Sequence, residues 1–482
     1  MHKGKLITVS YRLPYRFSIV RSKMTSSPGI GGLSTALGSY FENRDGGKNL
    51  FDSLHWVGVA DLSRKTFLKY SDKEELTKDN ITMHPIFLSQ QVKEKYYNGF
   101  CNSVLWPLFL YFPSFVVYKI EFFEEYVNAN KLFCEKIRDI FEPGDTIWVH
   151  DFHLMLLPTM LREILPEAKI GFFLHIPFPS FELYRLLPKP WRKELLSGLS
   201  GADVIGFQTN DFTEHFIDCV NDAFNVKSEP DGSFEINDRV TLMQSFPISI
   251  DYEKFSIESR TPWVRNNVRR IRERLGEVKI VLSVDRLDYS KAIFNRLEGF
   301  ELFLEQNPGL REKVIYLLMM VPSRESILKY RENKLAIEAL ISRINAAYGT
   351  IGWTPVVYQY QSPELKKLVT YYGAADIALI VPSRDGMNLV AKEYVASRVD
   401  GAGVLILSET AGAARELKEA IIVNPNDRQE IADAILQAVI MPTEDQKFRM
   451  SRMQAHVRKN DVVAWASGFL HAMTHIPEDV NA

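Results

Sequence analysis

Residues 376–393 read D-I-A-L-I-V-P-S-R-D-G-M-N-L-V-A-K-E, and this stretch decides the fold that we expect for the rest of the chain. The apolar run 376–381 predicts a buried parallel strand. Residues 382–388 predict a tight turn, and the apolar periodicity that continues through Val395 predicts a helix. A strand, a turn and a helix start in this order are typical of an α/β protein.

The turn between this strand and this helix carries side chains suited to a nucleotide sugar. A helix start offers unpaired backbone N–H groups and the positive end of the helix dipole, which together stabilise an anion. Gly386 lets the backbone approach such an anion closely. Asp385 is suited to sugar hydroxyls, and Glu393, about two turns further on, to the paired hydroxyls of a ribose. An ordinary Asp-Gly turn before a capped helix is the alternative for this stretch taken alone.

Strand patterns alternate with helix patterns along the whole chain. They cover residues 6–10, 54–60, 146–150, 169–174, 203–207 and 240–246 in the first half, and residues 278–284, 314–321, 356–360, 376–381, 404–407 and 421–423 in the second. This alternation predicts parallel, doubly wound sheets. We therefore expect an α/β protein with two Rossmann-like domains, residues 1–248 and 249–461, that face each other across a ligand-binding cleft. The last helix, about 462–482, is expected to cross back onto the first domain.

Composition excludes several classes of protein. The chain has 482 residues and a formal net charge of -2, which gives no general attraction to nucleic acid or to an anionic membrane. The uncharged stretch 100–118 contains two prolines, so it predicts core rather than a membrane span. Cys101, Cys134 and Cys219 lack the spacing of a zinc site or a disulfide framework, and they predict a cytoplasmic location.

Basic residues follow two strands of the second domain. Arg286 and Lys291 come after the strand 278–284, and Arg324 comes after the strand 314–321. Ligands of open α/β sheets bind at the carboxyl ends of the strands, and two cations there fit a diphosphate. A surface ion pair is the alternative for each residue alone. Since the sequence has no D-x-D motif and no His/Cys cluster, we expect these cations, and not a metal ion, to neutralise the diphosphate.

Polar residues end strands of the first domain in the same way. Arg12 follows the first strand, and Asp151 and His175 follow two later ones, although a lone histidine is more often structural. The glycine-rich stretch 26–32 precedes a helix start and suits phosphate, but a plain loop is an equal alternative. The aromatic run 96–106 predicts either core or a wall on which a sugar stacks.

Several long motifs together resemble one family. They are W-V-H-D-F-H-L-M-L-L-P (148–158), G-F-F-L-H-I-P-F-P-S (171–180), V-D-R-L-D-Y-S-K (284–291), R-D-G-M-N-L-V-A-K-E-Y-V-A (384–396) and L-S-E-T-A-G-A-A (407–414). In this order they closely resemble the trehalose-6-phosphate synthase family, glycosyltransferase family 20. The resemblance runs from about Val9 to the last helix.

The resemblance implies a fold, a reaction and a set of site residues. The fold would be GT-B, and the reaction would move glucose with retention from UDP-glucose to glucose 6-phosphate, giving α,α-trehalose 6-phosphate and UDP without a cofactor. By the same likeness, Arg286, Lys291, Asp385 and His175 are the catalytic candidates. The donor set is Gly31, Gly32, Arg286, Lys291, Asp385, Gly386, Glu393 and the backbone N–H groups of Asn388 and Leu389. The acceptor set is Arg12, Trp56, Tyr97, Trp106, Asp151 and Arg324, with Arg12 and Arg324 on the acceptor phosphate.

The chain departs from the family pattern at three positions. Tyr11 stands where the family commonly has Asn, Ala292 where it has Gly, and Thr410 where it has Phe. The alternatives are a synthase that uses glycerol 3-phosphate as acceptor and makes glucosylglycerol phosphate, or a catalytically silent regulatory subunit. We expect a cytoplasmic homo-oligomer that acts on small molecules and binds neither nucleic acid nor a membrane.

Overall fold

The structure, a computed structural model, describes residues 4–29, 32–42, 51–71, 75–226, 233–236, 239–323 and 328–474. The chain divides into two compact units: unit 1 comprises Met1–Ile248 and Val463–Ala482, and unit 2 comprises Ser249–Val462. No helix among the described residues is long and apolar enough to cross a bilayer.

Within the described residues, unit 1 is built on a nine-stranded sheet in the order β10-β11-β9-β8-β7-β1-β4-β6-β5. The strands are β1 (Lys5–Arg12), β4 (Ser53–Val59), β5 (Leu76–Lys78), β6 (Ile81–Ile86), β7 (Thr146–His150), β8 (Lys169–Phe173), β9 (Val204–Phe207), β10 (Ser233–Ile236) and β11 (Arg239–Ser245). The strands from β11 to β6 are parallel, whereas β5 and β10 pair antiparallel at the two edges. The predicted parallel sheet is therefore confirmed, and the two short antiparallel edge strands are additions that the sequence analysis did not predict.

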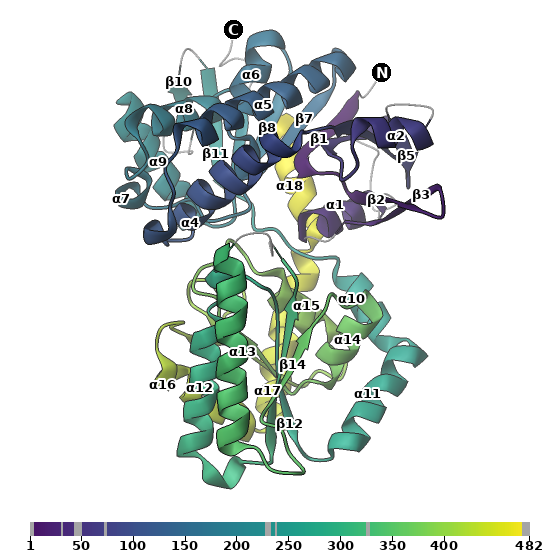
Figure 1. Cartoon of the computed structure of the whole chain (residues 1–482), viewed down its shortest axis with the longest axis vertical. Coiled ribbons are helices and arrows are strands. Elements are labelled where there is room, and N and C mark those ends of the chain that lie inside the picture. The colour runs from purple at the N-terminus through teal and green to yellow at the C-terminus, as the bar shows by residue number, and fades with distance from the viewer. Residues whose placement is uncertain are drawn as a thin grey trace. The chain divides into compact units, whose positions relative to one another are not determined.

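Helices cover this sheet, and the last helix of the chain is one of them (Figure 1). They are α1 (Gly32–Glu42), α2 (Arg64–Tyr70), α3 (Gln90–Val92), α4 (Trp106–Phe109), α5 (Ile120–Ile140), α6 (Leu157–Ile164), α7 (Phe181–Tyr184), α8 (Lys189–Leu199), α9 (Asn210–Phe224) and α18 (Val462–Thr474). Phe469 of α18 stacks on Trp148 of β7 at a centroid distance of 4.9 Å. A Cβ atom at Gly171 of β8 would lie 2.5 Å from Met473 Sδ, so α18 packs directly on a glycine of the sheet.

A hairpin and a π-helix of unit 1 were also not predicted from the sequence. One is the hairpin of β2 (Tyr15–Val20) and β3 (Lys23–Pro28), whose turn residues Arg21 and Ser22 have φ values of 48° and 60°. Tight hairpin turns with positive φ usually have Asn-Gly at these two positions, because other residues adopt positive φ rarely. The Arg-Ser pair here lacks that signal. The other is a π-helix, η2 (Lys93–Leu105), which leads into α4. Such i→i+5 helices are rare and often lie at functional sites.

Unit 2 is a parallel sheet of six described strands in the order β14-β13-β12-β15-β16-β17. The strands are β12 (Lys279–Arg286), β13 (Val314–Val321), β14 (Val356–Tyr360), β15 (Ile377–Ile380), β16 (Val404–Ser408) and β17 (Ile421–Val423). The helices are α10 (Tyr252–Arg260), α11 (Pro262–Leu275), α12 (Ile293–Gln306), α13 (Leu328–Tyr348), α14 (Leu365–Ala374), α15 (Leu389–Ser397), α16 (Arg428–Ile440) and α17 (Thr443–Lys459). Figure 1 shows α12 and α13 on one side of the sheet and α11 and α14 on the other. All six predicted strands are present, and the doubly wound α/β prediction is confirmed for this unit.

Candidate functional site

The loops after β12 and β15 meet at the carboxyl edge of the sheet in unit 2. Lys291 Nζ lies 2.5 Å from Asp385 Oδ2, and their side chains are 12% and 19% exposed. Asn388 Nδ2 donates to the same carboxylate oxygen at 3.0 Å. Arg286, the last residue of β12, has an exposed side chain that forms no ion pair with any described carboxylate. The structure thus brings Lys291, Asp385 and Asn388 into direct contact, with Arg286 at the end of the neighbouring strand.

The helix start at α15 has the geometry of an anion site. Asn388 adopts φ 81° and ψ 86°, and its side chain caps the helix by accepting a hydrogen bond from Ala391 N at 3.3 Å. Within the described part of the chain, the backbone N–H groups of Asn388 and Leu389 have no acceptor. Gly386 lies against Gly412, where a Cβ atom would come within 2.0 Å of Gly386 O. The loop is therefore packed tightly from behind, while its N–H groups remain available for an anion.

A buried ion pair that we did not predict supports these loops from below. Arg296 of α12 pairs with Asp285 at 2.7 Å, with side chains 1% and 4% exposed. The same guanidinium donates to Lys291 O at 3.0 Å and to Leu379 O at 3.1 Å. It therefore joins the loop that carries Lys291 to strand β15. The sequence signal was an arginine among the apolar residues of a helix, which a surface role would not explain.

Ala292 adopts a left-handed conformation, with φ 47° and ψ 41°, directly before α12. A left-handed backbone is unfavourable for an L-residue with a Cβ atom and is free of that cost for glycine. We predict that Ala292→Gly raises the free energy of unfolding by about 0.5–1 kcal/mol, because the relief of strain exceeds the entropy that glycine adds to the unfolded chain. Chemical denaturation measures this change. Ala346→Gly, at an exposed position inside α13, is the control and should lower stability by about 1 kcal/mol. A loss of stability in both variants would contradict the strain at Ala292.

Glu393 lies on α15, one residue beyond the buried Lys392, and its carboxylate has a phenol partner. Tyr372, which is 1% exposed, donates from its hydroxyl to Glu393 Oε2 at 2.8 Å. Burial raises the pKa of Glu393, while the hydrogen bond from Tyr372 lowers it. Sequence analysis assigned Glu393 to a ribose but missed Tyr372, because α14 supplies it from elsewhere in the fold.

We predict that Tyr372→Phe raises the pKa of Glu393 further, because the ionised carboxylate loses its hydrogen-bond donor. A protonated Glu393 is a poorer acceptor for ribose hydroxyls, so affinity for a nucleotide should fall first at acidic pH. The acid limb of the pH profile for nucleotide binding should therefore move to higher pH. Calorimetric titration with UDP at several pH values measures this limb. A parallel loss of affinity at every pH would instead indicate that Tyr372 acts only through packing.

In unit 1, Arg12 and Tyr97 lie together at the end of β1. The Arg12 side chain is exposed, and Arg12 Nη2 lies 3.4 Å from the Tyr97 hydroxyl. Trp56 is fully buried, and its indole N–H donates to Ser10 Oγ at 3.0 Å and to Arg12 O at 3.2 Å. Trp56 has no exposed surface for a ligand here, so its place in the acceptor set would be indirect, through the backbone of Arg12. Trp106 is 7% exposed and packs against Phe152.

Asp151 follows β7 with a strained backbone. Its φ of 75° and ψ of 166° lie in a region that residues other than glycine rarely adopt. Asp151 N donates to Phe173 O at 2.7 Å, and Asp151 Oδ1 accepts from His175 N at 3.3 Å. The carboxylate therefore lies beside the loop that follows β8, as the strand order predicts.

His175 is held by two other polar side chains. Its Nε2 lies 3.1 Å from His150 Nδ1, and its Nδ1 lies 3.5 Å from Gln208 Nε2. Gln208 Oε1 accepts from Ile248 N at 3.0 Å, which fixes the amide so that its NH₂ group faces His175. Burial lowers the pKa of His175 to about 3, so the imidazole is neutral at physiological pH. To bind a sugar hydroxyl, His175 would have to exchange its longer contact, with Gln208, for the ligand.

Two predicted site residues lie outside the described residues, namely Gly31 and Arg324. Gly32 is the first residue of α1.

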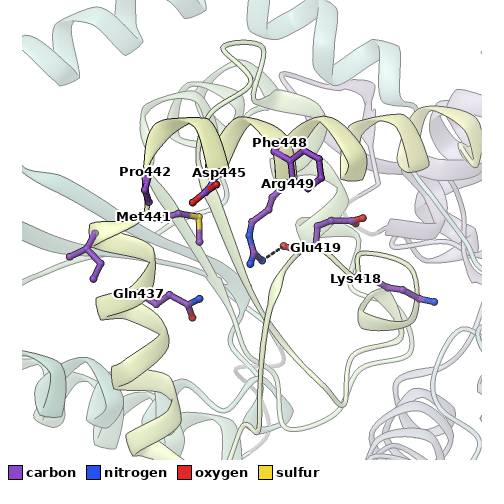
Figure 2. Close-up of a pocket in the computed structure, with 9 residues that line it drawn as sticks. Lys418, Glu419, Gln437, Met441, Pro442, Asp445, Phe448 and Arg449 are labelled. Atoms are coloured by element: carbon purple, nitrogen blue, oxygen red, sulfur yellow. Dashed lines mark hydrogen bonds between the residues drawn. The ribbon is translucent and has the colours of Figure 1, made fainter.

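A separate pocket of about 670 Å³ lies among α16, α17 and the loop before β17 (Figure 2). The hydrogen bond drawn in Figure 2 joins Arg449 Nη1 to Glu419 O at 2.9 Å. Because Glu419 precedes β17, this pocket is at the amino edge of the sheet, and none of the predicted site residues lines it.

The chain matches one family over almost its whole length. The sequence profile of glycosyltransferase family 20 covers residues 4–475. A bifunctional trehalose-6-phosphate synthase/phosphatase of Thermoproteus tenax is 40% identical over 470 residues, which make up 97% of this chain and 63% of that protein.

Two solved structures are similar over both chains. An α,α-trehalose-phosphate synthase (UDP-forming) from Burkholderia xenovorans in complex with glucose 6-phosphate has a TM-score of 0.87 and 32% identity, and the match covers 98% of this chain and 100% of that one. A second structure, described as trehalose-6-phosphate from E. coli bound with UDP-2-fluoro glucose, has a TM-score of 0.88 and 33% identity. This match covers 98% of this chain and 99% of that one. These likenesses confirm the predicted GT-B fold. The chain belongs to glycosyltransferase family 20.

Proposed function

We propose that this chain is a UDP-forming α,α-trehalose-phosphate synthase, which transfers glucose with retention from UDP-glucose to glucose 6-phosphate. The observation that carries the proposal is the arrangement at the carboxyl edge of unit 2. There a lysine, a carboxylate and a helix start with available N–H groups lie together, beside an exposed arginine. The family membership and the ligands of the two similar structures support the same assignment.

In unit 2, each group has a role that follows from its charge and position. Arg286, Lys291 and the N–H groups of Asn388 and Leu389 bind the diphosphate, and they stabilise the negative charge that develops on it as the glycosidic bond breaks. Asp385 is held by Lys291 and Asn388, and its remaining lone pairs accept hydrogen bonds from glucose hydroxyls. Glu393 accepts from the ribose. The carboxylates therefore orient the donor while the cations and the helix start stabilise the leaving group.

In unit 1, the residues suit a sugar phosphate. Arg12 supplies a positive charge for the phosphate, and Tyr97 supplies a ring and a hydroxyl beside it. Asp151 supplies a carboxylate for sugar hydroxyls, and His175 binds donor glucose in its neutral form. Retention is consistent with a reaction on one face of the sugar, in which the leaving phosphate helps to remove the proton of the acceptor hydroxyl.

One assay tests the proposal against the glycerol 3-phosphate alternative and the silent-subunit alternative. Pure protein is incubated with UDP-, GDP- or ADP-glucose and with either glucose 6-phosphate or glycerol 3-phosphate, and the products are identified by mass and by the anomeric coupling in NMR. We expect UDP and α,α-trehalose 6-phosphate. UDP release only with glycerol 3-phosphate would show that glycerol 3-phosphate, and not glucose 6-phosphate, is the acceptor. No turnover with any pair would support a silent subunit.

Three finer points belong to the same proposal. Because Arg286, Lys291 and a helix start neutralise the diphosphate, we expect turnover to continue in EDTA. The free, buried cysteines fit a cytoplasmic protein, which fractionation of the source cells would test. We also expect a homo-oligomer, so sedimentation should give a mass that is a multiple of 55.4 kDa.

A further inference from the structure

Tyr11 belongs to a cluster of three nearly parallel rings in unit 1, in which the other two, Tyr97 and His153, also lie 5.7 Å apart. Its ring lies 4.3 Å from the Tyr97 ring with an interplanar angle of 7°, and 5.0 Å from the His153 ring with an angle of 15°. The Tyr96 ring meets Tyr11 edge-on at 5.8 Å. The three stacked rings come from β1, from the π-helix η2 and from η4 (Phe152–Leu154), so the stack joins three segments that are distant in sequence.

Each of the two rings that stack on Tyr11 lies beside a residue of the proposed acceptor set. On one side, the Tyr97 hydroxyl lies 3.4 Å from Arg12 Nη2, and the Arg12 guanidinium lies 5.8 Å from the centroid of the Tyr97 ring. On the other side, His153 Nδ1 lies 3.7 Å from Asp151 Oδ2. Tyr11 therefore packs against the neighbours of both groups, the one that would bind the phosphate and the one that would bind the sugar hydroxyls.

We propose that Tyr11 is a positioning residue for the acceptor, an inference that rests on the proposed function. The three-ring cluster holds Tyr97, and through it Arg12, and also holds His153 beside Asp151, before the acceptor arrives. A site that is ordered in advance loses less side-chain entropy on binding, so it binds more tightly. Because Arg12 and Asp151 are both held in place, a phosphorylated hexose that reaches both is favoured over a three-carbon phosphate that reaches one.

The stack of rings, and not the hydroxyl of Tyr11, carries this role. Within the described residues no group forms a hydrogen bond with the Tyr11 hydroxyl, whereas its ring stacks on both Tyr97 and His153. Tyr11→Phe and Tyr11→His keep a flat ring against Tyr97 and His153, while Tyr11→Leu keeps an apolar side chain without a flat face. The three variants separate stacking from bulk and from hydrogen bonding.

The test measures the binding of glucose 6-phosphate by calorimetry and the KM values of both substrates. For Tyr11→Leu we expect the acceptor Kd and KM to rise about tenfold, which corresponds to the loss of one well-ordered contact, with the UDP-glucose KM unchanged. Phe and His variants should stay close to the wild type. Tyr11→Leu should also lose preference for glucose 6-phosphate over glycerol 3-phosphate, which a purely structural role would not change.

The outcomes separate this inference from the proposed function. An unchanged acceptor Kd in Tyr11→Leu, or equal rises in both KM values, overturns the positioning role even if the wild type makes trehalose 6-phosphate. A wild type that neither binds nor converts glucose 6-phosphate overturns both proposals. If Tyr11→Leu is too unstable to assay, as its melting curve would show, Tyr11→Met takes its place with the same expected rise, and failure of Tyr11→Phe to match the wild type would also contradict the role of the ring.

Discussion

Lys291→Ala lowers kcat for glucose transfer by about 100- to 1,000-fold, because it removes one of the positive groups that stabilise the departing diphosphate. The ammonium lies 2.5 Å from Asp385 Oδ2, so its loss also frees the carboxylate that is proposed to orient the sugar. Steady-state assays with saturating UDP-glucose measure the effect, and we expect Arg286→Ala to behave similarly. Circular dichroism and melting curves should match the wild type, because Lys291 lies in the loop after β12 rather than in the hydrophobic core of the sheet.

Lys279→Ala is the matched control for this prediction. Lys279 is the first residue of β12, the strand that Lys291 follows. Like Lys291, it pairs with an aspartate, since Lys279 Nζ lies 3.3 Å from Asp376 Oδ1. The substitution removes the same kind of side chain and the same kind of ion pair at the opposite edge of the sheet. Its turnover should equal that of the wild type. Equal losses in the Lys279 and Lys291 variants would mean that stability, and not a phosphate site, explains both.

Asp151→Ala and Asp151→Gly should each lower kcat/KM for the acceptor by at least about 100-fold, since either change removes the carboxylate proposed to bind the acceptor sugar. The two variants should nevertheless differ in stability. With φ 75° and ψ 166°, the backbone at Asp151 costs an L-residue about 1–3 kcal/mol, and glycine avoids that cost. Glycine also gives the unfolded chain more conformational entropy, which offsets part of this gain. We therefore expect Asp151→Gly to be more stable than Asp151→Ala by about 1 kcal/mol.

Denaturant unfolding of the two Asp151 variants measures the strain directly, because neither has the carboxylate and they differ by one methyl group. Equal stabilities would show that the loop relaxes and stores no strain. Near-normal turnover in either variant would remove Asp151 from the acceptor set. Together the results show whether Asp151 is needed for activity or for folding. If it were needed only for folding, glycine at this strained position would cost neither activity nor stability.

The sheet of unit 2 could be predicted from the sequence because its strands are short apolar runs at regular spacing, as in residues 376–381. The loop residues at the strand ends, such as Lys291 and Asp385, could be placed at one edge because parallel strands end together. The antiparallel strands β5 and β10 could not be predicted, because a short edge strand forms through its pairing with a neighbouring strand and its own composition does not reveal it. The hairpin at Arg21 lacked any turn signal.

Contacts between distant segments explain what the sequence did not predict at the site. Arg296 and Tyr372 act on Lys291 and Glu393 from other helices, and only the fold brings them together. The Tyr11 stack depends in the same way on η2 and η4. By contrast, local features were predictable: Gly386, Asn388 and Leu389 form a turn and a helix start, as their spacing indicated.

The most direct test of the account is the affinity of unit 2's carboxyl edge for a diphosphate. Isothermal titration of the full chain with UDP and with uridine, at low and moderate salt, isolates the contribution of the two phosphates. We expect UDP to bind the wild type far more tightly than uridine, and we expect the double variant Arg286→Ala, Lys291→Ala to bind both weakly and alike. A double variant that keeps the full preference for UDP would contradict the proposal that these cations hold the donor's diphosphate.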